Sequence, residues 1–231
     1  MNERDADTDT DTAADARPSA AAQHFFERAR AQLRLDVPPA LTDPSAQGIR
    51  RGDLDLDPAL WVRAGVAATK PAAVLVPVVD RAAPTVLLTQ RTAELASHAG
   101  QVAFPGGKID PTDESPVAAA LREAKEEVGL APMLVEPIGY LDLYLTFSGF
   151  RILPTVARVK PDFQLTLNPR EVTEAFEVPL EFLMDAANHR RKTRDWKGIA
   201  REYYEMPFGE RYIWGITAGI LRNLYERVYA A

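Results

Sequence analysis

The sequence predicts an α+β fold in which a mixed β-sheet lies between helices. Short segments rich in branched and aromatic residues recur through the middle of the 231-residue chain, and turn residues bound them. One helical pattern falls within this series of strands, and a longer amphipathic helical pattern closes the chain. A sheet with two apolar faces needs helices on both sides, which is the layered arrangement we expect.

The first part of the chain predicts a tail and a helix that precede the main domain. Residues 1–21 alternate Asp and Thr and then become rich in Ala, a composition that favours a disordered acidic tail. Residues 22–68 are predicted to form an N-terminal helix and an extension, with an imperfect apolar stripe over Ala22–Leu35. Residues 69–231 are predicted to form the main domain.

Five segments are predicted to be strands of the main sheet. The first two are separated by DRAAP and predict a hairpin. In chain order the segments are Ala72–Val79, Thr85–Gln90, Gln101–Phe104, Ile138–Leu145 and Phe150–Val159.

The last third of the chain predicts shorter elements and a closing helix. A short strand at Phe163–Leu167 is followed by a polar loop and by a short helix near Leu180–Ala187. The basic stretch HRRKTRDWKG occupies His189–Gly198. Apolar residues at steps of three and four predict a helix over Arg211–Tyr229.

Composition and charge exclude several classes of protein. The chain has no cysteine, which excludes disulfides, thiolate zinc sites and a cysteine nucleophile, and is compatible with a cytoplasmic protein. No apolar run is long enough to cross a bilayer, and the acidic N-terminus argues against a presequence. The net charge is −6, but residues 1–16 hold six acids and one base, so the remainder is near −1. We therefore expect no nucleic-acid partner, and a polyanionic substrate would need local arginines or metal ions.

The helical segment Ser115–Val128 gathers three acids on one face near its end. A Ser-Pro pair opens the segment as a good N-cap, and Glu123, Glu126 and Glu127 then lie three or four residues apart. Like charges at this spacing repel, and the negative end of the helix dipole disfavours them. One interpretation is a solvated helix face. The other is a site for Mg²⁺ or Mn²⁺, because hard divalent cations prefer carboxylate oxygens.

The sequence REAKEEVGL at residues 122–130 resembles the second half of the Nudix box, G-x5-E-x7-R-E-U-x-E-E-x-G-U, where U is aliphatic. Counting back, Glu114 fits the first glutamate of the box. Lys108 stands where the glycine is expected and Gly107 comes one residue early, so the loop carries one extra residue.

That longer loop, GGKIDPTD, is similar to the loop of the coenzyme A pyrophosphatase subfamily of Nudix hydrolases. The upstream stretch LLTQRTAELASHAGQVAFPGG, residues 87–107, resembles the subfamily pattern L-L-T-x-R-S-x3-R-x3-G-x3-F-P-G-G. Thr92 replaces Ser in that pattern, and Ala96 stands where the pattern has Arg.

The resemblance implies an α/β/α sandwich and an enzyme that needs Mg²⁺ or Mn²⁺. The substrate it implies is a small molecule, coenzyme A or acyl-coenzyme A, cleaved to 3′,5′-ADP and (acyl-)4′-phosphopantetheine. The alternatives are a Nudix pyrophosphatase acting on ADP-ribose, NADH or nucleoside triphosphates, and a non-catalytic nucleotide-sensing module. The oligomeric state stays open, with a homodimer among the alternatives.

The resemblance also implies roles for the acids. Glu123, Glu126 and Glu127 are expected to bind the metal, with the carbonyl oxygen of Gly107 as a further ligand. Asp113 or Glu114 would join through water. The catalytic residues expected are Glu123 and Glu126 from the box, together with Glu171 as the first choice of general base. Glu123 itself and Glu174 are the other candidates for that base.

Substrate contacts are expected from Arg91, His98, Gly106 and Lys108. Arg91 is equally compatible with a salt bridge at a strand end, and His98 with a histidine that packs in a loop. Arg122 is expected to orient a box glutamate. The basic stretch is either a mobile surface loop or a site that attracts the 3′-phosphate of coenzyme A.

Overall fold

The computed structural model describes residues 20–46, 50–52, 55–56, 70–95, 98–196 and 199–230. Its helices are α1 Ala20–Gln32, α3 Pro116–Val128, α4 Leu180–Met184 and α5 Ile216–Val228, with short 3₁₀ turns at Pro39–Leu41, Pro132–Leu134 and Ala186–Asn188. Its strands are β1 Arg50–Gly52, β2 Lys70–Val79, β3 Thr85–Arg91, β4 Val102–Ala103, β5 Gly106–Lys108, β6 Val135–Tyr140, β7 Leu143–Leu145, β8 Phe150–Val159, β9 Val172–Pro179, β10 Arg190–Trp196, β11 Ile199–Phe208 and β12 Arg211–Trp214.

Within the described residues, nine strands form one mixed sheet. Strands β1, β7, β8, β2, β3 and β4 follow one another in that order, and β5, β6 and β9 pair with β2, β8 and β3 respectively. The central pair β2–β8 is parallel over ten residues, whereas β2–β3 and β3–β9 are antiparallel. The remaining strands, β10, β11 and β12, form a separate antiparallel sheet.

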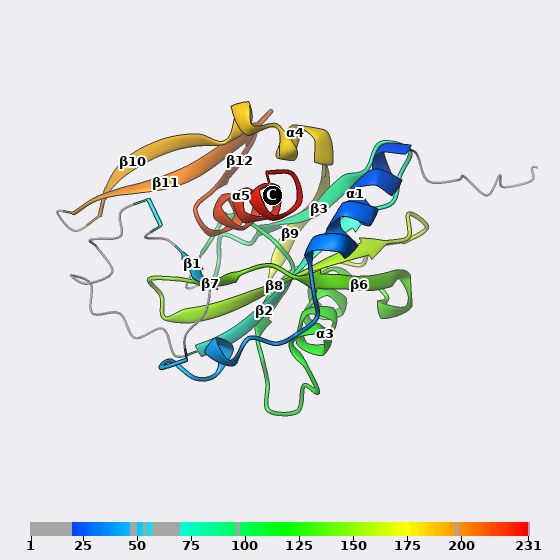
Figure 1. Ribbon diagram of the computed structural model, residues 1–231, viewed down its shortest axis with the longest axis horizontal. Coiled ribbons are helices and arrows are strands. Elements are labelled where there is room, and N and C mark those ends of the chain that lie inside the picture. The colour runs from blue at the N-terminus through cyan, green and yellow to red at the C-terminus, as the bar shows by residue number, and fades with distance from the viewer. Residues whose placement is uncertain are drawn as a thin grey trace, which may run out of the picture.

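Helices cover both faces of the main sheet, which confirms the predicted layering. Helix α3 lies on one face, and α1 and α5 lie on the other (Figure 1). The side chains of β2 alternate accordingly: Ala73 and Leu75 pack in the cluster that contains α3, and Val76 and Val78 pack in the cluster that contains α1 and α5. Because successive side chains point to opposite faces, a nearly continuous apolar strand indicates this double burial.

Helix α3 has the predicted boundaries because its ends are capped. The Ser115 hydroxyl accepts a hydrogen bond from the Ala118 N–H at 3.1 Å, and Gly129 adopts φ 72° at the C-terminal end. A left-handed residue at this place favours glycine, and a Cβ there would also lie 2.8 Å from the Thr166 nitrogen. The caps fix where the acidic turn of the helix ends.

Several predicted strands are confirmed with shifted boundaries. The hairpin β2–β3 and strand β8 form as predicted, and α1 begins and ends two or three residues earlier than predicted. The segment predicted at Gln101–Phe104 forms only β4, and the glycines after it form β5. The segment predicted at Ile138–Leu145 is divided into β6 and β7, which both pair with β8.

The strand predicted at Phe163–Leu167 is wrong. Its side chains alternate between half-buried and exposed, as in a strand, yet it pairs with no strand of the described chain. Instead, the Thr166 N–H donates to the Val128 carbonyl at 2.9 Å, and the Asn168 N–H donates to the Glu127 carbonyl at 2.9 Å. The end of α3 supplies the acceptors that a neighbouring strand would have supplied.

The polar loop predicted between Asn168 and Leu180 is also wrong over most of its length, because it contains β9. The segment was predicted to be a loop because its acidic residues are unusual in a strand. Glu177 accepts two hydrogen bonds of 2.7 Å from Arg81, and Glu174 is paired with Arg211. Ion pairs with neighbouring elements therefore let an acidic sequence form a strand of the sheet.

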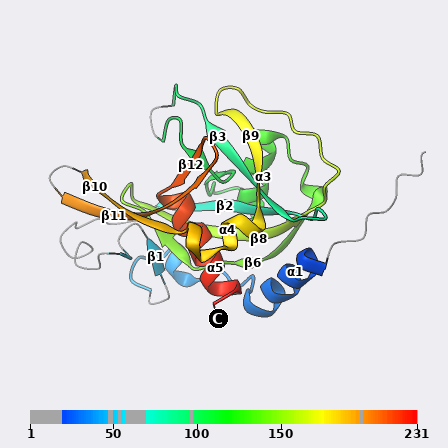
Figure 2. The same ribbon diagram turned by 90° about the horizontal axis from the view of Figure 1, so that it is seen from above.

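The C-terminal region differs most from the prediction. The basic stretch forms β10 instead of a loop, and the closing helix begins at Ile216 because Arg211–Trp214 is β12. Ile213 is buried, as the helical stripe required, but it is buried from the strand. The β10–β11 hairpin projects from the rest of the molecule in both views (Figures 1 and 2). No helix among the described residues is long and apolar enough to span a membrane.

The predicted tail, residues 1–21, lies outside the described residues except for Ala20 and Ala21, the first two residues of α1. Helix α1 itself belongs to the same core as α5, since Phe25, Phe26 and Leu33 are almost fully buried in the cluster that contains Leu221 and Leu224. The N-terminal helix therefore packs on the main domain.

His189 is a buried histidine that precedes β10 and contacts Arg222 of α5. Its Nε2 lies 2.7 Å from the Leu183 carbonyl, and its Nδ1 lies 3.4 Å from Nη1 of Arg222. This arrangement suits a neutral ring in which Nε2–H donates and Nδ1 accepts. Burial is the main cause that lowers the pKa of His189, and the charge of Arg222 adds to it. The hydrogen bond with the Leu183 carbonyl and the charges of Asp185 and Glu226 act in the opposite direction.

We predict that His189 makes the protein less stable below about pH 6.5, the ordinary pKa of histidine. An unfolded chain binds a proton there that the folded chain rejects, so this part of the stability is present at higher pH and lost as the pH falls. Urea unfolding between pH 7.5 and 5 should show a steeper loss in the natural chain than in His189→Gln. His24→Gln, at an exposed position, is the matched control. Parallel curves for the natural chain and H189Q would contradict the prediction.

Candidate active site

The carboxylate of Glu127 is the buried centre of the acidic cluster. Its side chain is 1% exposed. One oxygen lies 3.3 Å from Nη1 of Arg91 at the end of β3, and the other accepts the Gly106 N–H at 3.2 Å. Burial raises the pKa of Glu127 to about 7, even though Arg91 and the Gly106 N–H act to lower it. Burial therefore disfavours the charged form of Glu127, and a further cation nearby would favour it.

Glu123, one turn earlier on α3, faces the glycine turn. A Cβ on Gly107 would lie 2.5 Å from a carboxylate oxygen of Glu123, so only glycine leaves that oxygen in place. Burial raises the pKa of Glu123, and Arg122 acts in the opposite direction. The Glu123 carboxylate therefore occupies the place that a side chain at position 107 would fill, and α3 packs closely on the glycine turn.

Arg122 holds the loop and the helix together. Its guanidinium bonds both oxygens of Asp113 at 3.0 Å, and its Nη2 donates to the Lys108 carbonyl at 3.2 Å. Its Nη1 lies 3.0 Å from Glu123 and 3.2 Å from Glu126. Arg122 therefore contacts two of the box glutamates, as a positioning role would require, and its single charge is shared among three carboxylates.

The acids of the cluster supply carboxylate oxygens, the kind of ligand that suits a divalent cation. In the described chain, no group of three acidic or imidazole side chains is already gathered around one point. Glu123 and Glu126 share Arg122, and Glu127 is paired with Arg91. The donors are nevertheless all carboxylate oxygens, the type that Mg²⁺ and Mn²⁺ prefer. A cation bound by these oxygens would also offset the burial that raises the pKa of Glu127.

Glu171 belongs to this cluster, and Glu174 does not. Glu171 lies just before β9, where its side chain accepts a hydrogen bond from the Asn168 amide at 3.1 Å. Burial is the main cause that raises the pKa of Glu123 and Glu127, and the negative charge of Glu171 adds to it for both. Glu174 is instead paired with Arg211 of β12.

The four predicted substrate contacts lie in two places. Arg91 and Gly106 contact Glu127, and Lys108 is exposed at the end of β5. His98 is exposed at φ 57° in the loop before β4, with Nδ1 2.9 Å from the Gln101 side chain. It lines a cavity of about 680 Å³ that the box residues do not line.

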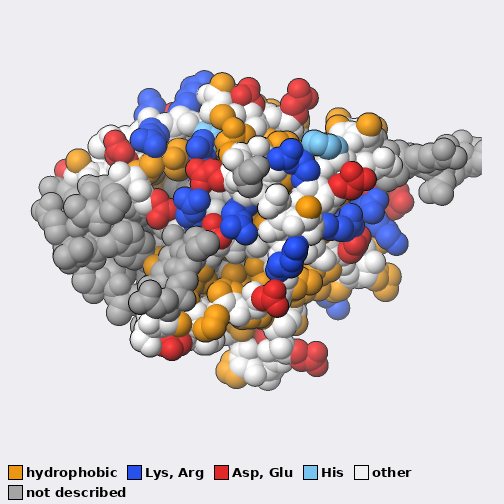
Figure 3. Space-filling view, in the orientation of Figure 1, with side chains coloured by type: hydrophobic (Ala, Val, Ile, Leu, Met, Phe, Trp, Pro, Cys, Tyr) orange, Lys and Arg blue, Asp and Glu red, His pale blue; other side chains and the backbone are white. Residues whose placement is uncertain are grey.

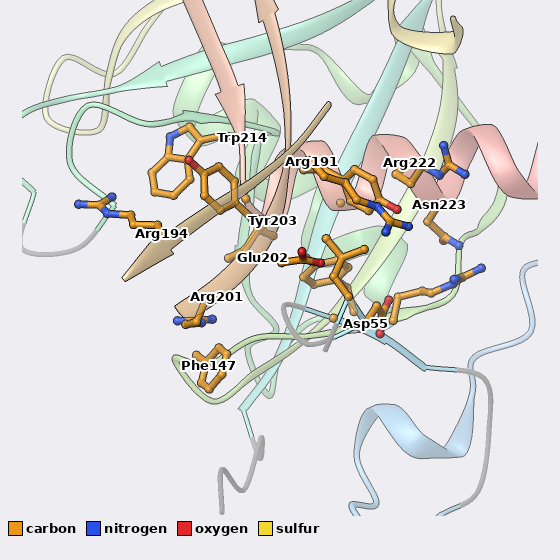
Figure 4. Close-up of a pocket in the computed structure, with 18 of the residues that line it drawn as sticks. Asp55, Phe147, Arg191, Arg194, Arg201, Glu202, Tyr203, Trp214, Arg222 and Asn223 are labelled. Atoms are coloured by element: carbon orange, nitrogen blue, oxygen red, sulfur yellow. The ribbon is translucent and has the colours of Figure 1, made fainter. Parts of the chain in front are cut away.

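The cavity lies between the small sheet, the start of α5 and the loop after β7 (Figure 4). Sequence reasoning missed most of its lining, including Tyr203 of β11 and Trp214 of β12. The stretch REYYEMPF is rich in aromatic residues typical of strands, and this signal would have predicted β11. The face of the molecule in Figure 3 carries acidic and basic side chains interspersed.

The comparisons with known proteins agree with this architecture. A family model described as the NUDIX domain matches residues 69–198, more than half of the chain. A Nudix hydrolase called NudL from Escherichia coli K12 is 42% identical over 153 residues, which cover 66% of this chain and 80% of that protein. NudL of Citrobacter koseri is 43% identical over the same shares of each chain.

The layered fold and these relatives define the class: the protein is a hydrolase that acts on pyrophosphate bonds. The chain belongs to the Nudix family. The matched domain ends at residue 198, so β11, β12 and α5 lie beyond it. Nudix hydrolases generally use divalent metal ions.

Solved structures of related fold include an Ap4A hydrolase from C. elegans, with 23% identity, a TM-score of 0.42 and coverage of 48% of this chain and 80% of that chain. The NUDIX domain of NrtR from Shewanella oneidensis, solved with ADP ribose, has 19% identity and a TM-score of 0.36, and the match covers 60% of this chain and 79% of that chain.

We predict that Gly107→Ala weakens Mn²⁺ binding about 10- to 100-fold, the usual effect of disturbing the support of a metal ligand. The new methyl group would displace the Glu123 carboxylate, which is the flexible end of a side chain, so the fold should survive. Free Mn²⁺ can be followed by electron paramagnetic resonance during a titration. Ser115→Ala is the control: it should lower the free energy of unfolding by about 1 kcal/mol and leave the Mn²⁺ affinity unchanged. Unchanged affinity in G107A would exclude Glu123 from the metal site.

Proposed function

We propose that this protein hydrolyses the pyrophosphate bond of coenzyme A or acyl-coenzyme A with Mg²⁺ or Mn²⁺, giving 3′,5′-ADP and (acyl-)4′-phosphopantetheine. One observation carries the proposal. The two contacts that hold Glu127 come from Arg91 and Gly106, and both belong to the LLTQR…FPGG stretch that resembles the coenzyme A pyrophosphatase signature. The subfamily stretch and the general Nudix box are therefore parts of one site.

The acids of the cluster have distinct roles in this proposal. Glu123, Glu126 and Glu127 would hold the metal, with the Gly107 carbonyl as a further ligand. When bound, the metal neutralises the pyrophosphate, activates water and stabilises the leaving oxygen. Arg91 keeps Glu127 in position, and Arg122 does the same for Glu123 and Glu126.

Glu171 is our proposed general base, with Glu123 as the alternative. Its contact with the Asn168 amide leaves the second carboxylate oxygen to accept a proton from water. Its charge acts on both Glu123 and Glu127, which supports a place beside the reacting groups. Glu174 is a weaker candidate because Arg211 already pairs with it.

We predict that Glu171→Gln lowers kcat by about 10² to 10⁴, the range typical of a lost general base. Glu174→Gln is the matched control, three residues further along the chain, and should change kcat less than threefold by the same reasoning. Steady-state kinetics with saturating Mg²⁺ measure both variants. Equal activity of E171Q and the natural chain would assign the base elsewhere, with Glu123 next.

ADP-ribose, NADH and nucleoside triphosphates are the alternative substrates. The observation in their favour is Ala96, which replaces the Arg of the subfamily pattern and lies outside the described residues. A non-catalytic sensing role is disfavoured because all three box glutamates are present.

The substrate is tested by incubating the purified full chain with Mg²⁺ and each compound and separating the products by chromatography. We expect coenzyme A to yield 3′,5′-ADP, and Glu127→Gln to reduce this turnover by orders of magnitude while the fold is kept. Glu181→Gln, at an exposed position of α4, is the matched control and should retain activity. Unchanged coenzyme A with cleavage of ADP-ribose or NADH would refute the substrate, and near-normal turnover by E127Q would refute the metal ligand.

A further inference from the structure

The small sheet presents one face with a distinctive set of side chains. Residues directly opposite in an antiparallel ladder share a face, and so do alternate residues of one strand. The pairings Arg194↔Arg201 and Glu205↔Trp214 therefore place Arg194, Arg201, Tyr203 and Trp214 together. We call these four residues the arginine–aromatic face. All four line the cavity, and Figure 4 shows them grouped on one side of it.

The opposite face of the same sheet is different. It carries the buried Met206 and Ile213, which pack in the core that contains α5. Arg191 and Glu202 also lie on that side, towards Arg222. Residues from both faces of the small sheet thus line the cavity, one group on the arginine–aromatic face and the other on the side of α5.

Two arginines directly opposite one another are the unusual feature of the arginine–aromatic face. Like charges in this position destabilise a sheet unless something compensates them. Arg194 lies 5.9 Å from the centroid of the Trp214 ring and makes no ion pair with any described residue. Arg201 lies 3.4 Å from the centroid of the Phe147 ring. Glu202, which lines the cavity, lies on the other face of the sheet. Glu205 lies on the same face as Trp214, but it accepts the Tyr212 hydroxyl at 2.6 Å and lies 3.9 Å from Lys192.

The same face presents aromatic rings beside the two cations. Tyr203 and Trp214 meet edge to face with centroids 5.5 Å apart, and Trp214 is only partly buried. Aromatic rings stack with nucleic-acid bases, and a guanidinium bonds a phosphate through two parallel N–H groups. Rings and paired arginines together recognise a base that carries a phosphate on its sugar.

The arginine–aromatic face is connected to the acidic cluster by a short piece of chain. Gln101 lines the cavity, and its carbonyl accepts the N–H of Arg91 at 2.9 Å. The first turn of α5 is fixed to the same segment, because the Thr217 hydroxyl donates to the Val102 carbonyl at 2.8 Å. Gln101 and Gly106 are five residues apart, so their backbones are separated by at most about 18 Å.

We infer that the arginine–aromatic face binds the phosphorylated adenosine of the substrate, with the purine against Trp214 and Tyr203 and the 3′-phosphate between Arg194 and Arg201. The inference rests on the proposed function for the choice of a 3′-phosphate. It assigns specificity in part to β11 and β12, which lie beyond the matched NUDIX domain, together with Arg194 of β10, which lies within it.

The test is the binding of adenosine 3′,5′-bisphosphate to the full chain, measured by isothermal titration calorimetry beside AMP. Arg194→Ala should weaken the binding of the bisphosphate about tenfold or more, as expected for the loss of one charge-assisted contact. The binding of AMP should be weakened much less. Arg190→Ala is the matched control, because Arg190 lies on the same strand and face but does not line the cavity. It should change either affinity less than twofold. Arg194→Lys keeps the positive charge but lacks the planar guanidinium. Its affinity for the bisphosphate should lie between those of the natural chain and R194A.

Kinetics separate this inference from the proposed function. In R194A, KM for coenzyme A should rise about tenfold with kcat unchanged, and KM for dephospho-coenzyme A should stay the same. Cleavage of coenzyme A with the natural KM in R194A would overturn the binding site and leave the function standing. No cleavage of coenzyme A, but a selective loss of bisphosphate binding in R194A, would overturn the function and support the site. Equal effects of R190A and R194A, or no bisphosphate binding by the natural chain, would overturn the inference.

Discussion

The buried carboxylate of Glu127 is the constraint on which the site depends. A charge that water cannot reach must be met by other groups of the protein. Strand β3 meets it with Arg91, and β5 meets it with the Gly106 N–H. These two groups reach the same side chain only because β3 and β5 both pair with β2. Sheet topology, glycine turn and helix end are therefore fixed together.

Charge is arranged in two opposite ways in this molecule. On α3, three acids that repel one another share two arginines, Arg91 and Arg122, so their charge is offset within the chain only in part. On the small sheet, Arg194 and Arg201 face one another, and Glu202 of the cavity lies on the other face. The chain as a whole outside its first residues is almost neutral, so both concentrations of charge are local features rather than parts of a general field.

The sequence was informative wherever a local rule decided the structure. Runs of branched residues between turn residues predicted β2 and β8, and the Ser-Pro cap and the three- and four-residue spacing predicted α3 with its acids on one face. It was misleading where a distant partner decided. The acids of β9 are tolerated because Arg81 and Arg211 come from other elements, and the basic stretch becomes β10 because the aromatic β11 pairs with it. No single segment contains that information, so the cavity wall was not predicted.

Arg122 reduces the repulsion among the acids at the end of α3. With its guanidinium shared among Asp113, Glu123 and Glu126, the repulsion between the glutamates is relieved before any ion arrives. Ion pairs within the chain thus offset part of a repulsion that small metal-dependent domains leave to their ion. One guanidinium serves three carboxylates, so a group that displaced Arg122 from one of them would leave it bonded to the other two.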